Sequence, residues 1–152
     1  MEVKFAKLRD NAVIPFKKHL NDVGYDLVYA PEEPDPLGHV IIGPGGKHRF
    51  KTGIKALFPP GFVMEIKNRS GLSFNDSVLV SGGIIDPDYR GEIMVALHNT
   101  TNDHFAYIKE GDKIAQAIFF KIEHLQIEEI SLEDYEKEQT ERASNGYGST
   151  GK

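Results

Sequence analysis

The 152-residue chain contains no cysteine, which excludes a disulfide framework, a thiolate zinc site and a cysteine nucleophile. Its six histidines, at positions 19, 39, 48, 98, 104 and 124, include no pair at metal-ligand spacing, so they are interpreted as structural or surface residues. The G-x-S-x-G pattern of a serine nucleophile is absent as well. The sequence therefore offers no thiolate zinc site, no cysteine nucleophile and no serine in a nucleophile-elbow pattern.

Positive charge is also in short supply. Lysine and arginine number 18 against 23 aspartates and glutamates, which gives a formal net charge of −5. A nucleic-acid polymer is therefore not expected as a partner, although a phosphate ligand can bind where a few arginines converge. No apolar run has the length of a signal peptide or a membrane span, so no membrane partner is expected. The default expectation is a cytoplasmic location, or the host-cell cytoplasm for a virus-borne protein.

Turn-forming residues are plentiful, with 15 glycines and 8 prolines, and they separate short apolar runs. No heptad or longer repeat is present, and the length suits one domain. The runs 54–58 and 62–66 alternate on either side of a Pro-Pro-Gly turn at 59–61, which predicts a hairpin with one buried face. With further strands expected at 3–8 and 40–42, the pattern predicts an all-β fold.

The run 114–122 carries apolar residues on both faces of the expected strand. A second sheet or another subunit is therefore expected to cover it. Gln116 shares one face with Ile114 and Ile118. A buried amide needs a partner, because leaving it bare costs on the order of 1–3 kcal/mol. A core hydrogen bond, a ligand or an ordered water would each satisfy Gln116.

The stretch 81–92, SGGIIDPDYRGE, is the most distinctive part of the chain. Apolar β-rich runs at 78–80 and 93–97 flank it, and Asp-Pro-Asp is turn chemistry, so it is interpreted as a hairpin. Gly82 and Gly83 permit a close backbone approach or a positive φ. Asp86 is placed to orient a water molecule, with Tyr89 as one wall of a site. The alternative is a plain hairpin with a charged, solvated tip.

Two other places suit the recognition of charge. Asp26 lies between apolar neighbours, where its charge needs a cation or hydrogen-bond donors. An edge strand with Asp26 facing water is the alternative, and both interpretations stay open. Arg69, Ser70 and Gly71 place a guanidinium, a hydroxyl and an uncovered backbone N–H in succession. This set suits an anion but also occurs in loops that bind nothing.

The sequence changes character after Ile130. Ser131 is predicted to cap a short polar helix with acidic residues in its first turn. The final residues, 146–152, superficially match a phosphate-binding P-loop, but no Ser or Thr and no helix follow Lys152 in this sequence. A glycine-rich end with one aromatic, Tyr147, suits either a flap that closes over a ligand or a disordered tail.

Five segments of the chain, taken in order, resemble the five motifs of the trimeric deoxyuridine triphosphate nucleotidohydrolase (dUTPase) family. They are VGYDL at 23–27, NRSGLS at 68–73, GGIIDPDYRGEI at 82–93, GDKIAQAIF at 111–119 and RASNGYGSTG at 142–151. The resemblance spans nearly the whole chain, and five ordered matches are far more specific than any single motif.

The resemblance implies a jelly-roll-like β-sandwich over residues 1–141, assembled as a homotrimer with shared active sites. It implies that residues 142–152 form a flexible flap that completes each site. The implied reaction is hydrolysis of dUTP to dUMP and pyrophosphate, with Mg²⁺ as the cofactor and attack of water on the α-phosphate. Such an enzyme of nucleotide metabolism keeps uracil out of DNA.

Roles follow from the resemblance by position. Asp86 would be the base that activates the water, and Asp26 would meet the Mg²⁺ shell through water. The implied substrate-binding residues are Arg69, Ser70, Gly71, Gly83, Ile84, Ile85, Tyr89, Gln116, Arg142, Tyr147, Gly148 and Ser149.

The resemblance also implies which part of the substrate each of these residues would contact. Backbone groups at 83–85 would face the uracil edge, Tyr89 would pack on the deoxyribose, and Tyr147 would stack on the base. The phosphates would be held by residues 69–71, by Gln116 and, at the γ-position, by Arg142.

The chain departs from the family's usual pattern in a few places. Asn68 stands where the family usually has proline or alanine, Ala143 and Asn145 replace glycines, and Tyr147 replaces the commoner phenylalanine. None of these changes removes a chemical group that the mechanism needs, so activity is expected.

Two rival functions remain open. A dCTP deaminase would share the fold and phosphate site, but it would need a glutamate as the deaminating base. A regulatory module would use the nucleotide pocket to switch a protein partner, for which the proline- and glycine-rich segment 31–47 offers a surface. Asp86 argues against a pure binding module but leaves a second role possible.

Overall fold

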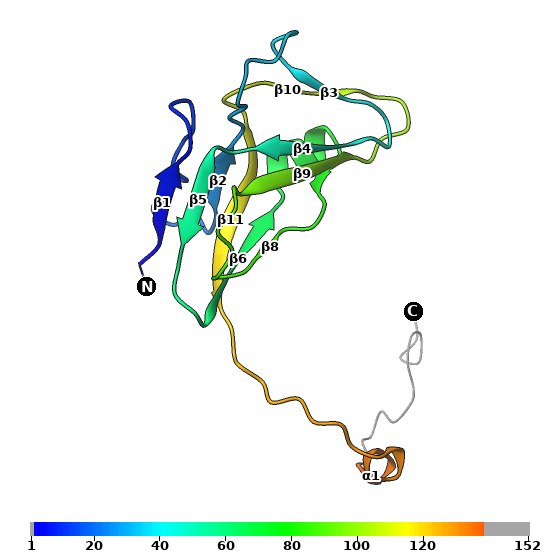
Figure 1. Ribbon diagram of the computed structural model, residues 1–152. Helices are drawn as coiled ribbons and strands as arrows, with labels where there is room; N and C mark the ends of the chain where they lie inside the picture. Colours follow the sequence, from blue (N-terminus) through cyan, green and yellow to red (C-terminus); the bar gives the residue numbers. More distant parts are fainter. Residues whose placement is uncertain (1, 139–152) are drawn as a thin grey trace.

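The computed structural model describes residues 2–138 of the chain (Figure 1). The predictions for Arg142, Tyr147, Gly148 and Ser149, and for the segment 142–152, lie outside the described residues.

The regular secondary structure of the described chain is almost entirely β, as predicted. Its strands form two larger and two smaller sheets. The larger sheets have the strand orders β2-β11-β6-β8 and β4-β9-β7, and the two-stranded sheets pair β1 with β5 and β10 with β3. The strands are β1 (Lys4–Lys7), β2 (Tyr25–Val28), β3 (Val40–Ile42), β4 (Lys47–Lys51), β5 (Ile54–Leu57), β6 (Phe62–Lys67), β7 (Val78–Val80), β8 (Ile84–Ile85), β9 (Met94–Asn99), β10 (Ala106–Ile108) and β11 (Lys113–Lys121).

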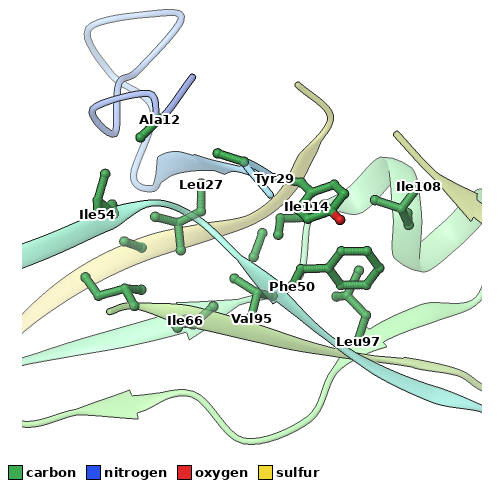
Figure 2. Packing of buried hydrophobic residues seen from close by; sticks show 14 of the residues in the cluster. Ala12, Leu27, Tyr29, Phe50, Ile54, Ile66, Val95, Leu97, Ile108 and Ile114 are labelled. Carbon is green, nitrogen blue, oxygen red and sulfur yellow. The ribbon is translucent and has the colours of Figure 1, made fainter. Parts of the chain in front are cut away.

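One apolar core lies between the sheets (Figure 2). Leu27 and Ile66 from the four-stranded sheet and Phe50 and Leu97 from the three-stranded sheet are all at most 3% exposed. Each such side chain stabilises the fold by roughly 1.5–3 kcal/mol relative to full exposure. The alternation of apolar and polar residues along the strands therefore becomes a sandwich with two inward faces.

Tyr29 brings a polar group to the edge of this core. Its ring packs edge-on against Phe50, with 4.9 Å between the ring centroids, and its hydroxyl donates to Asp35 Oδ1 at 3.1 Å. Burial, reinforced by the bond to Asp35, raises the pKa of Tyr29 from 10.0 to about 12. The folded state therefore favours the protonated phenol, and this stabilisation is lost as the pH rises from about 10 through 12.

The hairpin predicted around the Pro-Pro-Gly turn is wrong in its pairing. β5 and β6 flank the turn, but β5 pairs with β1 while β6 pairs with β11 and β8. Their buried faces are as predicted, because Ile54, Met64 and Ile66 are at most 3% exposed. Alternation specifies which side chains turn inward, but it does not specify the partner strand, and here the turn leads from one sheet to another.

The hairpin predicted across 78–97 is present only in part. β7 and β9 pair antiparallel as expected, with Val80 opposite Leu97. Between them, however, β8 leaves this sheet and pairs with β6, with Ile84 opposite Glu65. The stretch 81–92 is therefore a crossing between two sheets and not the tip of one hairpin.

β11 is the central strand of the four-stranded sheet, between β2 and β6. Ile114, Ala115 and Ala117 are buried, so both faces of its first half are covered as predicted. Its second half is less covered, since Phe120 is 44% exposed. The strands β4 and β10 were not predicted, because their sequences, KHRFK and AYI, show little or no apolar alternation.

Beyond β11 the chain leaves the sheets and runs through an extended segment to α1 (Leu132–Lys137), drawn in orange in Figure 1. Ser131 caps this helix as predicted, because its side chain accepts a hydrogen bond from the Asp134 N–H. Leu125 and Ile127 on the extended segment are 80% and 95% exposed. Neither α1 nor the single π-helical turn η1 (Gly71–Asn75) is long and apolar enough to cross a membrane, and the described residues contain no other helix.

A largely buried ion pair anchors the end of the 81–92 stretch. The guanidinium of Arg9 contacts both carboxylate oxygens of Glu92, at 2.7 and 3.1 Å, and both side chains are 14% exposed. The same carboxylate accepts the Gly53 N–H at 2.7 Å, and Arg9 also donates to the Ala30 carbonyl at 3.0 Å. The pair therefore ties together the N-terminal strand, the β4–β5 turn and the chain entering β9.

We predict that Arg9→Gln lowers the free energy of unfolding by about 3 kcal/mol, because it leaves the Glu92 carboxylate largely buried without its cation. Urea unfolding monitored by circular dichroism measures the change. Lys4→Gln is the control, since its pair with Glu2 is 68% and 77% exposed and should contribute less than about 1 kcal/mol. Equal losses in the two variants would contradict the assigned role of Arg9.

Candidate active site

A cavity of about 260 Å³ opens where β2, β11 and the end of β6 meet the loop that precedes β2. It brings together four residues that the sequence predicted for substrate or metal binding: Asp26, Arg69, Ser70 and Gln116. Lys18, His19, Asp22, Val23, Gly24 and Lys113 complete its lining. Residues far apart in the sequence thus form one polar, cation-rich hollow.

Asp26 sits at the edge strand β2, yet its side chain is only 15% exposed. Its carboxylate lies 3.0 Å from Arg69 Nη1 and 2.8 Å from Lys113 Nζ. Of the two interpretations of Asp26 left open by the sequence, the structure supports the one in which cations meet the charge. The Lys113 ammonium also lies 4.7 Å from the centre of the Phe16 ring, which fixes the cation from a second side.

Arg69 has unused hydrogen-bonding capacity. Its Nη1 atom is buried, and despite its distance of 3.0 Å from Asp26 it has no hydrogen-bond acceptor among the described residues. The guanidinium and the Asp26 carboxylate are close enough for Coulomb attraction. The Arg69 N–H does not point at the carboxylate oxygen, however, so no hydrogen bond forms. A partly exposed guanidinium with one buried, unsatisfied N–H favours an anion that brings further acceptor oxygens into the cavity.

Gln116 is held in a defined position by two backbone neighbours. Its Nε2 donates to the Asn68 carbonyl at 2.8 Å, and its side chain packs directly on Gly24. A Cβ atom at Gly24 would collide with the amide of Gln116, so glycine is required there. The hydrogen-bond partner expected for this buried amide is therefore a backbone carbonyl, while the Oε1 atom packs against Gly24.

Ser70 and Gly71 follow Arg69 at the start of η1. Gly71 has open space where a side chain would be, since a Cβ there would meet no atom within 4 Å. With Arg69 and Lys113 it lines a second, adjoining cavity of about 530 Å³. The two cations therefore stand between two hollows, and the backbone beside them is accessible.

The predicted residues of the 81–92 stretch form a separate group. Gly83 has a φ of +130° and its backbone lies against β6, where an added Cβ would be 2.7 Å from the Ile66 carbonyl oxygen. Asp86 is exposed in the turn that follows β8, and the Tyr89 N–H donates to its carbonyl at 3.2 Å. The Tyr89 ring folds over Gly91, and its hydroxyl donates to the Glu92 carbonyl at 3.0 Å.

The two groups do not meet within one chain. Ile85 lies opposite Met64 on β6, so Asp86 lies near the beginning of that strand, whereas Arg69 follows its end. Four residue steps of strand, from the level of Asp86 to Lys67, correspond to about 13 Å, and Arg69 lies two residues beyond that end. The described residues of one chain therefore present a phosphate-type cavity and, at a distance, an exposed carboxylate with glycines and an aromatic ring.

The sequence analysis assigned no binding role to three residues that line the cavity, Lys18, His19 and Lys113. Lys113 lies within the GDKIAQAIF segment, two residues before Ala115, but a lysine at the start of a strand carries no signal by itself. A β-bulge between Lys113 and Ala115 shifts the register of β11. Counting alternate residues back from Gln116 therefore does not predict the face of the sheet on which Lys113 lies. No group of three or more potential metal-ligating side chains occurs in the part of the chain that the structure describes.

Comparison with known proteins gives a consistent result. The family model for dUTPase matches residues 10–151. The deoxyuridine 5'-triphosphate nucleotidohydrolase of Fowlpox virus (strain NVSL) is 39% identical over 150 residues, which cover 99% of this chain and 97% of the viral protein.

Solved structures of similar fold include two phage proteins. The dUTPase of Staphylococcus bacteriophage 80alpha with dUPNHPP matches with a TM-score of 0.83 at 24% identity, covering 99% of each chain. A mutant dUTPase from phage phi11 of S. aureus, whose structure details the coordination of a structural Mg(II) ion, matches with a TM-score of 0.75 at 22% identity, covering 93% of this chain and 99% of the other. The predicted jelly-roll-like β-sandwich is thereby confirmed.

We predict that Arg69→Met weakens the binding of inorganic tripolyphosphate by about tenfold or more, because a charge-assisted hydrogen bond to the anion is lost. Isothermal titration calorimetry measures the affinity. Arg49→Met, on the exposed side of β4, removes the same charge elsewhere and should change the affinity by less than about twofold. An equal loss in both variants would mean that net charge, and not this cavity, determines the binding.

Proposed function

The chain belongs to the dUTPase family, and we infer that it hydrolyses dUTP to dUMP and pyrophosphate by attack of a water molecule on the α-phosphorus. The observation that carries this proposal is the cavity around Arg69, where a buried guanidinium N–H lacks an acceptor among the described residues. Hydrolysis of the α–β bond releases pyrophosphate and leaves a nucleoside monophosphate. The resulting role is the removal of dUTP, which keeps uracil out of DNA.

The phosphates are proposed to lie in the cavity near Arg69, Ser70 and Gln116. The guanidinium and hydroxyl donate to non-bridging oxygens, and the N–H of Gly71 is uncovered. Lys113 adds a further positive charge 2.8 Å from Asp26. Although the whole chain carries a net charge of −5, the local set of cations offsets the charge of a triphosphate.

The donor set fits Mg²⁺ in one particular way. Two carboxylates line the cavity, Asp26 and Asp22, and Asp22 already accepts the His19 N–H; no cluster of three ligating side chains occurs in the described range 2–138. Mg²⁺ keeps several waters and prefers substrate phosphates, so one carboxylate that meets the ion through water is sufficient. When bound, the ion neutralises charge on the phosphate oxygens. Arg69 and Lys113, which hold Asp26 in the absence of ligand, then have phosphates as alternative partners.

Asp86 is proposed as the base. An ionised carboxylate accepts a proton from the attacking water and orients its lone pair toward phosphorus. The exposed position of Asp86, in a turn closed by the Tyr89 N–H, leaves its side chain free to face a ligand. Backbone groups of residues 83–85 recognise the uracil edge, and the ring of Tyr89 packs against deoxyribose.

Because Asp86 and Arg69 lie toward opposite ends of β6 within one chain, we infer that a complete site requires residues from more than one copy. We propose a homotrimer in which the phosphate cavity of one chain faces the 81–92 stretch of another. Exposed apolar residues on the extended segment, Leu125 and Ile127, and Phe120 on β11 provide surface for such an assembly. The family's fifth motif, 142–152, is proposed as the flap that completes the site with Arg142 and Tyr147.

We predict that Asp86→Asn lowers kcat for dUTP at least about a hundredfold, because the amide keeps the shape but loses the proton acceptor. Pyrophosphate release measures kcat, and dCTP serves as the alternative substrate in the parent protein. Asp88→Asn, on the same turn, is the control and should retain most of the activity. Turnover of the Asp86 variant within threefold of the parent protein would refute the assignment.

We predict that two inactive variants restore activity when they share an assembly. Arg69→Met and Asp86→Asn chains, co-expressed with different affinity tags and purified by both tags, should regain about a third of the parent kcat per site, because every mixed trimer contains one site in which both halves are intact. Mixing the separately purified, non-exchanging proteins is the control. Activity of the co-purified protein no higher than that of either variant would contradict the shared site.

A further inference from the structure

Asn68 stands at the end of β6, directly before Arg69, and makes contacts in two directions. Its side-chain Oδ1 accepts a hydrogen bond from the Val80 N–H at 2.5 Å. Its backbone carbonyl accepts a hydrogen bond from Gln116 Nε2 at 2.8 Å. One residue thus contacts both the strand that enters the 81–92 stretch and the amide that is proposed to bind phosphate.

The contact with Val80 crosses from one sheet to another. Val80 ends β7, which pairs only with β9 in the described chain, so its outward N–H has no partner strand. Asn68 directly follows β6, which ends at Lys67 in the four-stranded sheet. The side-chain amide therefore bridges the opening between the two sheets at the point where the chain crosses it.

A second tie lies a short distance further along the same crossing. The Ile66 N–H donates to the Gly83 carbonyl at 2.7 Å. The segment from Val80 to Gly83 is consequently tied at both ends to β6 or to the residue that follows it, by Asn68 at one end and by Ile66 at the other. Gly82 and Gly83, with φ of +88° and +130°, have backbone freedom that other residues lack, so these two ties and the bond from the Ser81 N–H to the Ala96 carbonyl hold the segment in place.

We propose that Asn68 is a positioning residue that holds the 80–83 segment, and with it the backbone groups offered to uracil, in register with the phosphate-binding residues. This inference rests on the proposed function. Asparagine supplies a side-chain acceptor for the Val80 N–H, which proline or alanine at this position would lack.

Amide hydrogen exchange of Val80, followed by NMR without nucleotide, tests the tie directly. Asn68→Ala should speed the exchange of Val80 by about tenfold, the size expected for one lost hydrogen bond. Asn68→Asp keeps an acceptor oxygen and should restore slow exchange. Ser81, whose N–H donates to the Ala96 carbonyl at 2.8 Å, is the internal reference, and Asn102→Ala, an exposed asparagine in the 100–104 turn, is the matched control.

Steady-state kinetics test the consequence for the substrate. Asn68→Ala should raise KM for dUTP by about five- to tenfold and leave kcat within about twofold, because uracil recognition weakens while Asp86 and Arg69 remain. The affinity for tripolyphosphate should stay unchanged, which separates the base-binding part of the site from the phosphate part. The Asn102→Ala protein should behave as the parent protein in every assay.

The outcomes are distinguishable. Unchanged exchange of the Val80 N–H in Asn68→Ala would overturn the tie itself. Faster exchange with an unchanged KM, or an equal loss of tripolyphosphate affinity, would overturn the positioning role. If the parent protein releases no pyrophosphate from dUTP, the proposed function fails, while the exchange experiment still decides whether Asn68 holds the segment.

Discussion

The close approach of Gly83 to β6 is the constraint on which the architecture of this chain depends. A hydrogen bond of 2.7 Å from the Ile66 N–H to the Gly83 carbonyl joins the two backbones, and any side chain at position 83 would meet the Ile66 carbonyl. Because that approach is possible, the chain passes from β7 to β8 and so from one sheet to the other. The same crossing brings Asp86 to an exposed turn and returns through the Arg9–Glu92 pair into β9.

The cavity combines a rigid part with an electrostatic part. Gln116 is held by Gly24 and by a backbone carbonyl, so its geometry exists before any ligand arrives. Arg69 and Lys113, in contrast, are balanced against one carboxylate, Asp26, and each can exchange this partner for phosphate oxygens. When an anion binds, Gln116 therefore needs no rearrangement, whereas Arg69 and Lys113 need only exchange the Asp26 carboxylate for oxygens of the anion.

The sequence predicted the fold class and the inward faces of the strands well, because a period of two residues reports burial directly. It failed for the partner strands of β5 and β6, since alternation carries no information about which edge a strand meets. Three of the five motifs indicated four residues that line the cavity, Asp26, Arg69, Ser70 and Gln116, yet Lys113 was missed behind a bulge. The two open interpretations of Asp26 depended on neighbours more than 40 residues away, Arg69 and Lys113, which local patterns cannot place.

The position of β11 has a consequence for biosynthesis. This strand is the last one in the described residues 2–138, yet it lies in the middle of the four-stranded sheet, between β2 and β6. During translation, β2 and β6 must wait for residues 113–121 to leave the ribosome before that sheet can close. Pairing across such sequence separations is slow, and until it occurs the nascent chain exposes unpaired strand edges to other chains. From the strand order we expect the closure of this sheet to be a late and slow step in the folding of the nascent chain.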